Sequence, residues 1–132
     1  MNAGDTFIID EPGTSLDSHL WIIISDPAAD PENVILVNFT KYRADKDQAC
    51  IVDRNDHPFI SQRTCVEYRG AKAASAKELQ TLLDNGLVVS HKPVAPELLA
   101  KIRAGVPQSR MRNEHVLILT AQGLVDPGDC GF

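Results

Sequence analysis

The sequence predicts an α+β fold, with a small antiparallel barrel or sandwich in the N-terminal half and two or three helices after it. Short apolar runs rich in β-branched residues recur at close intervals up to Tyr68, with no helical pattern between them. Leucines at helical spacing begin only at Leu79. The 132 residues, of which 43% are hydrophobic, suffice for one domain with a single core.

Two apolar segments form the predicted centre of the sheet. Leu20–Asp26 and Val34–Thr40 are nearly unbroken apolar runs, which is typical of strands buried on both faces. Between them, residues 27–33 hold two prolines, two acidic residues and an asparagine, so this segment should be a turn. We expect the two strands to pair antiparallel, with His19 opening the first and Thr40 closing the second.

The other strands and turns of the N-terminal half are shorter. Before the central hairpin we expect a strand over Gly4–Asp10 and a loop over Glu11–Ser18 that contains Pro12-Gly13. After it we expect a charged loop over Lys41–Gln48, a strand over Ala49–Val52 and a turn over Asp53–His57. An extended segment should then begin at Phe59 and Ile60, followed by a half-exposed strand over Thr64–Tyr68.

Helical signals dominate after residue 75. Ser75 followed by Glu78 is a capping box, which predicts a helix over Ala76–Asp84 that stops at Gly86. Leu87–Ser90 should be briefly extended. Pro96 suits a first helical turn and predicts a second helix ending near Gly105.

The last periodic segment, Asn113–Gln122, fits either a helix or a strand, and helix is favoured. The tail from Val125 should be loose. The predicted organisation is therefore a barrel over residues 4–70, a helical part over residues 75–123 and a tail over residues 124–132, all in one domain.

Composition limits the classes of function. The net charge of −5 disfavours non-specific binding to nucleic acid, although basic residues cluster in the middle third of the chain: Lys41, Arg43, Lys46, Arg54 and Arg63. No apolar run approaches the roughly 18 residues of a membrane span, and the first residues lack the pattern of a signal peptide. We therefore expect a cytoplasmic protein without a membrane partner.

The cysteines and glycines carry no cofactor motif. Cys50, Cys65 and Cys130 form no Cys-x-x-Cys pair, so neither a disulfide framework nor a zinc site is indicated, and Cys50 and Cys65 should be small buried hydrophobes. The sequence contains no Gly-x-x-x-x-Gly-Lys and no Gly-x-Gly-x-x-Gly motif. We expect no metal and no cofactor.

The order of these pieces resembles the MazF/PemK (Kid-like) toxin family over about residues 4–68. The resemblance rests on Gly4-Asp5, Pro12-Gly13, the strand that ends in Ser25 before a proline, and the strand that ends in Asn38-Phe39-Thr40. It implies an SH3-like barrel and a dimeric, metal-independent endoribonuclease that cuts single-stranded RNA and is inhibited by a cognate antitoxin. His19 stands where the family usually has arginine, and Leu20 replaces the following proline.

The candidate chemistry follows from what RNA cleavage needs without a metal. The reaction requires a base for the 2′-hydroxyl, an acid for the leaving oxygen and positive charge near the phosphate. His19 and His57 can exchange protons near neutral pH, and Asp56 could orient the ring of His57 or raise its pKa. We expect these histidines and Thr40 to be the catalytic residues, with substrate bound by Asn38, Lys41 and Arg43.

Ordinary structural roles compete with each assignment. His57 could simply pack in its turn, His19 could hydrogen-bond locally at the start of a strand, and Trp21 should be a core residue rather than a base-stacking platform. The alternative function is a non-catalytic SH3-like binding module for protein or nucleic acid.

Overall fold

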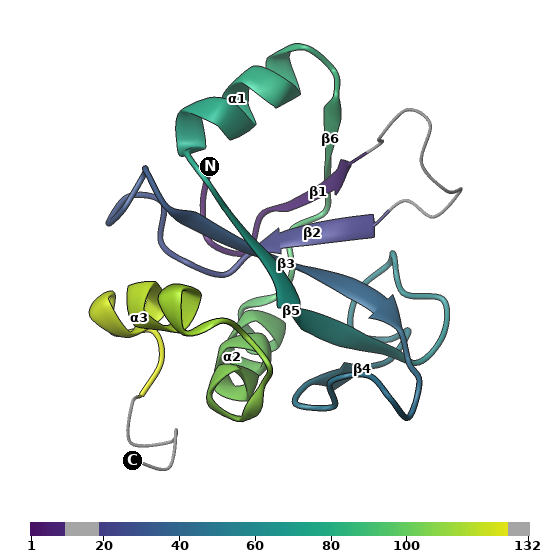
Figure 1. Ribbon diagram of the computed structural model, residues 1–132. Helices are drawn as coiled ribbons and strands as arrows, with labels where there is room; N and C mark the ends of the chain where they lie inside the picture. Colours follow the sequence, from purple (N-terminus) through teal and green to yellow (C-terminus); the bar gives the residue numbers. More distant parts are fainter. Residues whose placement is uncertain (10–18, 127–132) are drawn as a thin grey trace.

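The computed structural model describes residues 1–9 and 19–126 of the chain, and within them it has an α+β fold (Figure 1). The predicted Pro12-Gly13 loop and Cys130 lie outside the described residues. The strands are β1 (Thr6–Ile9), β2 (His19–Ile23), β3 (Val34–Lys41), β4 (Ile51–Val52), β5 (Thr64–Ala74) and β6 (Val88–His91). The helices are α1 (Ala76–Asp84), α2 (Pro96–Gly105), the 3₁₀ turn Val106–Gln108 and α3 (Asn113–Ala121).

The described strands form one six-stranded antiparallel sheet in the order β4-β5-β3-β2-β1-β6. Strands β4 and β6 are its two edges, and no ladder of hydrogen bonds joins them among the described residues. The sheet is therefore open, and the closed SH3-like barrel that the resemblance implies is not confirmed.

The central hairpin agrees with its prediction. β2 and β3 pair antiparallel, with Trp21 opposite Asn38 and Ile23 opposite Leu36. From Leu20 to Ile23 in β2 and from Val34 to Phe39 in β3, every residue is buried. Because successive side chains of a strand point to opposite faces, a strand buried along its length must be covered on both sides.

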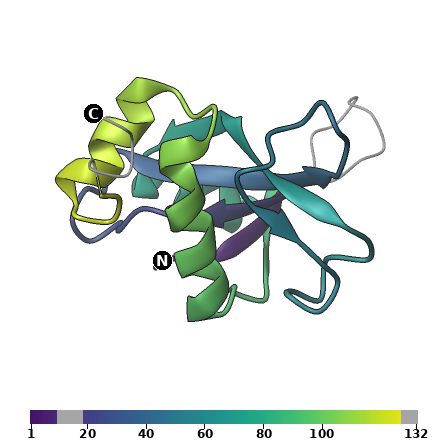
Figure 2. The same cartoon turned by 90° about the horizontal axis from the view of Figure 1, so that it is seen from below.

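Each face of the sheet has its own core and its own helices (Figures 1 and 2). On one face, Leu20, Ile22 and Ile24 pack with residues of α2 and α3, including Ile102 and Leu119. On the other, Trp21, Ile23 and Phe7 pack with Leu79 of α1, together with Val34, Leu36 and Val88. Alternate side chains of β2 therefore belong to the two different cores.

Strand β5 is longer than the predicted Thr64–Tyr68, because it continues to Ala74 after an irregularity. Asn38 faces Glu67 and Leu36 faces Lys72, so four residues of β5, numbers 68–71, stand opposite Val37 alone. Tyr68, within this irregularity, is buried, and its hydroxyl donates a 2.7 Å hydrogen bond to the carbonyl of Ile102 in α2. The irregularity therefore attaches β5 to the helix beneath it.

The predicted helices α1 and α2 are present, and the Ser75 hydroxyl caps α1 by accepting from the Glu78 amide at 3.0 Å. The ambiguous segment 113–122 forms the helix α3.

Two local expectations are wrong, and a third is confirmed and extended. Phe59 and Ile60 lie in a turn rather than a strand, since the Ile60 amide bonds to the His57 carbonyl at 3.0 Å. The extended segment expected over Leu87–Ser90 is confirmed as β6, which pairs with β1 and so belongs to the sheet. Val125 is buried in the core, so the chain is packed up to that residue.

Candidate functional site

A cavity of about 410 Å³ lies where β2 begins and β3 ends. We call it the His19 pocket. Its wall comes from β2, from β3 and the loop after it, and from the segment that leads into β5. The lining residues are His19, Phe39, Thr40, Lys41, Arg43, Lys46, Phe59, Ile60, Ser61, Gln62 and Thr64.

Four of the six predicted site residues line this pocket: His19, Thr40, Lys41 and Arg43. The antiparallel hairpin explains their proximity, because the first residue of β2 must lie beside the last residues of β3. His19 Nδ1 lies 3.3 Å from the carbonyl oxygen of Phe39 and donates to it. In the neutral ring, Nε2 then carries the lone pair and is the nitrogen that can accept a proton.

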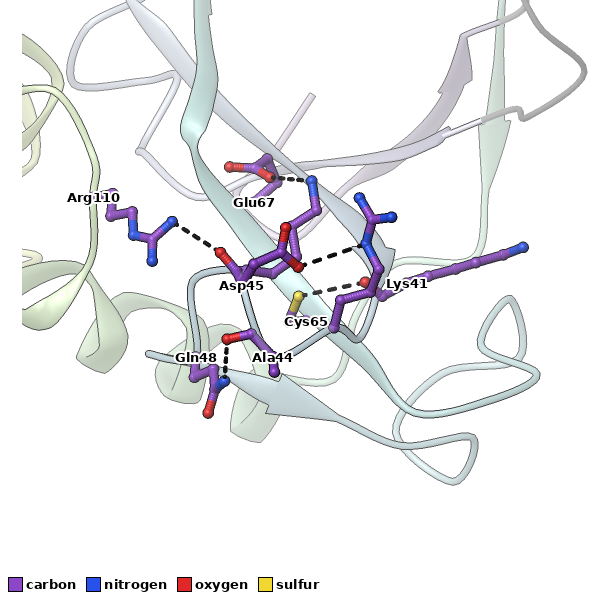
Figure 3. A network of polar contacts seen from close by, with 9 residues as sticks. Lys41, Ala44, Asp45, Gln48, Cys65, Glu67 and Arg110 are labelled. Carbon is purple, nitrogen blue, oxygen red and sulfur yellow. Dashed lines mark hydrogen bonds and ion pairs between the residues drawn. The ribbon is translucent and has the colours of Figure 1, made fainter.

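The loop after β3 carries the pocket's positive charge, and a buried carboxylate holds this loop in place. Asp47 is 6% exposed. Its two oxygens accept hydrogen bonds from the amides of Ala49 at 3.0 Å and Arg110 at 2.7 Å. Arg110 also donates through its guanidinium to the carbonyl of Asp45 at 3.2 Å (Figure 3). The chain between α2 and α3 thereby fixes the shape of the basic loop.

Two ion pairs accompany the loop. Lys46 and Glu67 lie 3.8 Å apart with side chains 29% and 25% exposed, so this pair is partly shielded from water. Arg43 and Asp45 lie 3.7 Å apart and are both exposed, which leaves Arg43 able to turn toward an anion in the pocket.

Cys50 and Cys65 are buried, as predicted. Cys65 lies beside the pocket's basic loop, and its thiol donates to the Lys41 carbonyl at 3.9 Å (Figure 3). Burial raises the pKa of both Cys50 and Cys65, which disfavours the nucleophilic thiolate.

His57 is not among the residues that line the His19 pocket. It is 4% exposed, its Nε2 donates to the Lys92 carbonyl at 2.6 Å, and its Nδ1 accepts from the Phe59 amide at 3.1 Å. Burial lowers the pKa of His57, opposite to the increase expected from a neighbouring carboxylate. The carboxylate of Asp56 instead accepts from the amide of Asp53 at 2.8 Å. The structure therefore does not bring His57 into the pocket that His19 lines.

Asn38 also lies apart from the pocket lining. It is buried in β3 between Trp21 of β2 and Glu67 of β5. Trp21 is a core residue, as expected, and the Lys72 ammonium lies 4.9 Å from the centre of its ring.

Sequence reasoning missed part of the pocket. In the sequence, Lys46 is only one of several clustered basic residues, and Ser61, Gln62 and Thr64 carry no signal of a site. Asp47 also gave no signal, because its partner Arg110 is 63 residues away.

Within residues 1–9 and 19–126, no group of three or more His, Cys, Asp or Glu side chains could hold a metal ion. In the same part of the chain, no helix has the length and hydropathy needed to cross a membrane. No protein-family model, curated protein or solved structure matches this chain.

Proposed function

We propose that the His19 pocket binds single-stranded RNA and cleaves it without a metal, in the manner of a MazF/PemK-like toxin. The observation that supports this proposal is the gathering of His19, Thr40, Lys41 and Arg43 on one pocket wall. The pocket combines a proton acceptor, a hydroxyl and cations, and it also has apolar walls from Phe39 and Phe59, against which a base can pack.

In the proposed reaction, His19 Nε2 takes the proton of the ribose 2′-hydroxyl. The 2′-oxygen bonds to phosphorus, the bond from phosphorus to the 5′-oxygen breaks, and that oxygen takes a proton from water. The hydroxide that remains takes the proton from His19 and so restores the neutral ring. The products are a 2′,3′-cyclic phosphate and a 5′-hydroxyl. Lys41 and Arg43 stabilise the charge that develops on the phosphate, and Thr40 donates a hydrogen bond to it.

A non-catalytic binding module is the second candidate function. It is favoured because His19 is the one histidine among the described residues that line the pocket, so no second imidazole is there to act as the acid. The net charge of −5 also limits affinity for RNA. In this case the same cations bind RNA or an acidic protein segment, and nothing is cut.

The remaining expectations belong to the same proposal. A toxin of this type acts in the cytoplasm, forms a homodimer and is inhibited by a cognate antitoxin. The cationic wall of Lys41, Arg43 and Lys46 suits an acidic segment of such an antitoxin, which would compete with RNA for the pocket.

The test uses purified full-length protein and end-labelled single-stranded RNA. We expect products that end in 2′,3′-cyclic phosphate, and we expect His19→Ala to lower the cleavage rate by about 10²–10⁴-fold while RNA still binds. Lys41→Ala and Arg43→Ala should weaken binding, whereas Arg54→Ala, an exposed arginine outside the pocket lining, should not.

Each result separates the two candidates. RNA that is bound but left intact by the wild type would support the binding module. RNA that is neither bound nor cut, together with normal growth of cells that express the protein, would refute both RNA-based readings. Cleavage that His19→Ala leaves at the wild-type rate would refute the role of His19.

A further inference from the structure

The two edges of the sheet approach each other at one polar contact. The turn after β4 reaches the chain after β6, where His57 Nε2 donates to the Lys92 carbonyl at 2.6 Å. The same carbonyl accepts a 2.7 Å hydrogen bond from the hydroxyl of Thr6 in β1. A side chain therefore joins the edges where a closed barrel would have a ladder of backbone bonds.

The hydrogen bonds of His57 require a neutral ring. Nδ1 accepts from the Phe59 amide at 3.1 Å, so it must carry a lone pair, and Nε2 must carry the proton that it donates to Lys92. A protonated ring has N–H groups at both positions. Its Nδ1–H would point at the N–H of Phe59, and that hydrogen bond would be lost.

The surroundings of His57 also oppose a positive charge. The ring is 4% exposed and lies 5.4 Å from the ring of His91 in β6, at 45° to it. The ammonium group of Lys92, the residue after β6, also acts on the ring. Burial is the main cause of the lowered pKa of His57, and the charges of His91 and Lys92 add to the effect, although the Lys92 carbonyl opposes it.

The carboxylates of the same turn have other partners. Asp56 accepts from the Asp53 amide at 2.8 Å, and Asp53 lies 3.4 Å from the guanidinium of Arg63. The charges that act on His57 from β6 and from the residue after it belong to His91 and Lys92, which are basic, and the charge of each makes protonation less favourable.

His57 also fixes one wall of the His19 pocket. The amides of Phe59 and Ile60 both bond to His57, to its ring at 3.1 Å and to its carbonyl at 3.0 Å. Phe59, Ile60, Ser61 and Gln62 all line the pocket. A change at His57 therefore acts on the wall that follows it directly in the chain.

We propose that His57 is a pH-sensitive clasp on the 59–62 wall of the His19 pocket. Its protonation breaks the bond to the Phe59 amide and loosens that wall, whereas Nε2 keeps its proton and still donates to the Lys92 carbonyl. The clasp rests on hydrogen-bond geometry and not on the proposed RNA chemistry, so refuting one of the two proposals does not refute the other.

Nuclear magnetic resonance tests the clasp in the intact protein. At pH 7.5 the nitrogen shifts of His57 should show the tautomer protonated at Nε2, and the Phe59 amide should be protected from hydrogen exchange. After correction for the intrinsic exchange rate, protection at Phe59 should fall by about tenfold per pH unit below the unperturbed pKa of a histidine, because the open state binds one more proton. The Ile24 amide, which bonds to the Ile35 carbonyl at 3.0 Å, should stay protected and so distinguishes local opening from unfolding.

Three variants complete the test. In His57→Gln, an amide replaces the ring and does not titrate, so protection at Phe59 should no longer depend on pH. His91→Gln removes a neighbouring base and should move the midpoint of opening to higher pH. His19→Gln, a matched histidine removal on the pocket wall, should leave the response unchanged.

Two results would overturn the clasp. One is a Phe59 amide that stays protected while His57 gains its proton. The other is an equal loss of protection in wild type and in His57→Gln. If His57→Gln fails to fold, the wild type alone still provides the test. The clasp requires that the Phe59 amide loses protection over the same pH range in which the nitrogen shifts of His57 report protonation.

Discussion

Asp47 is the residue whose replacement should most disturb the basic loop of the pocket. In Asp47→Ala the amides of Ala49 and Arg110 both lose their acceptor in a site where the carboxylate is 6% exposed. Each unsatisfied buried donor costs about 1–3 kcal/mol. Because water can partly reach the Arg110 amide, the total loss of unfolding free energy for the two amides should be about 2–4 kcal/mol. In a chain of this length, Tm should fall by about 4 °C for each kcal/mol.

The assay is urea unfolding followed by the fluorescence of Trp21, the single tryptophan. Asp45→Ala is the matched control, because it removes a carboxylate two residues away whose ion pair with Arg43 is exposed and worth at most about 1 kcal/mol. Asp47→Asn keeps one acceptor and should fall between the two. An Asp47→Ala variant as stable as Asp45→Ala would refute the assignment of Asp47 as the residue that holds the loop.

Three further predictions concern the fold. Gly105→Ala should destabilise by about 1–3 kcal/mol in urea unfolding, because the new methyl group would collide with the Tyr68 hydroxyl, and Tyr68→Phe in the same chain should recover part of the loss. Ser75→Ala should cost about 1 kcal/mol by the same assay, since the Glu78 amide loses its cap, and an unchanged midpoint would contradict that role. The lowered pKa of His57 means that the unfolded chain binds the proton first, so the free energy of unfolding should decrease as pH falls below 6.5, and His57→Gln should flatten that part of the profile.

The elements that sequence could predict are those set by neighbours in the chain. Helix α1 follows from Ser75, Glu78 and leucines at helical spacing, and the central hairpin follows from two apolar runs across a short turn. That hairpin also brings His19 close to Thr40, so the core of the candidate site was predictable from one local pairing.

The rest depends on contacts between distant parts of the chain. His57 meets the Lys92 carbonyl 35 residues away, and this contact joins segments beside opposite edges of the sheet. The continuation of β5 could not be recognised because Arg69 and Gly70 interrupt the alternation expected of a strand, and only β3 opposite them shows that pairing resumes. Local patterns contain no information on either point.

The attachment of the first strands to the last helices has a consequence for synthesis of the chain. The Ile24 carbonyl accepts from Arg103 at 2.8 Å across 79 residues, and the Asp26 amide donates to Gln122 at 2.8 Å across 96 residues. At about 5–20 residues per second, the ribosome completes the β2–β3 hairpin, which ends at Lys41, about 4–16 s before Gln122 is made. During that interval the hairpin face that α2 and α3 later cover is bare, so the nascent chain presents an apolar surface that suits a chaperone until its final helix emerges.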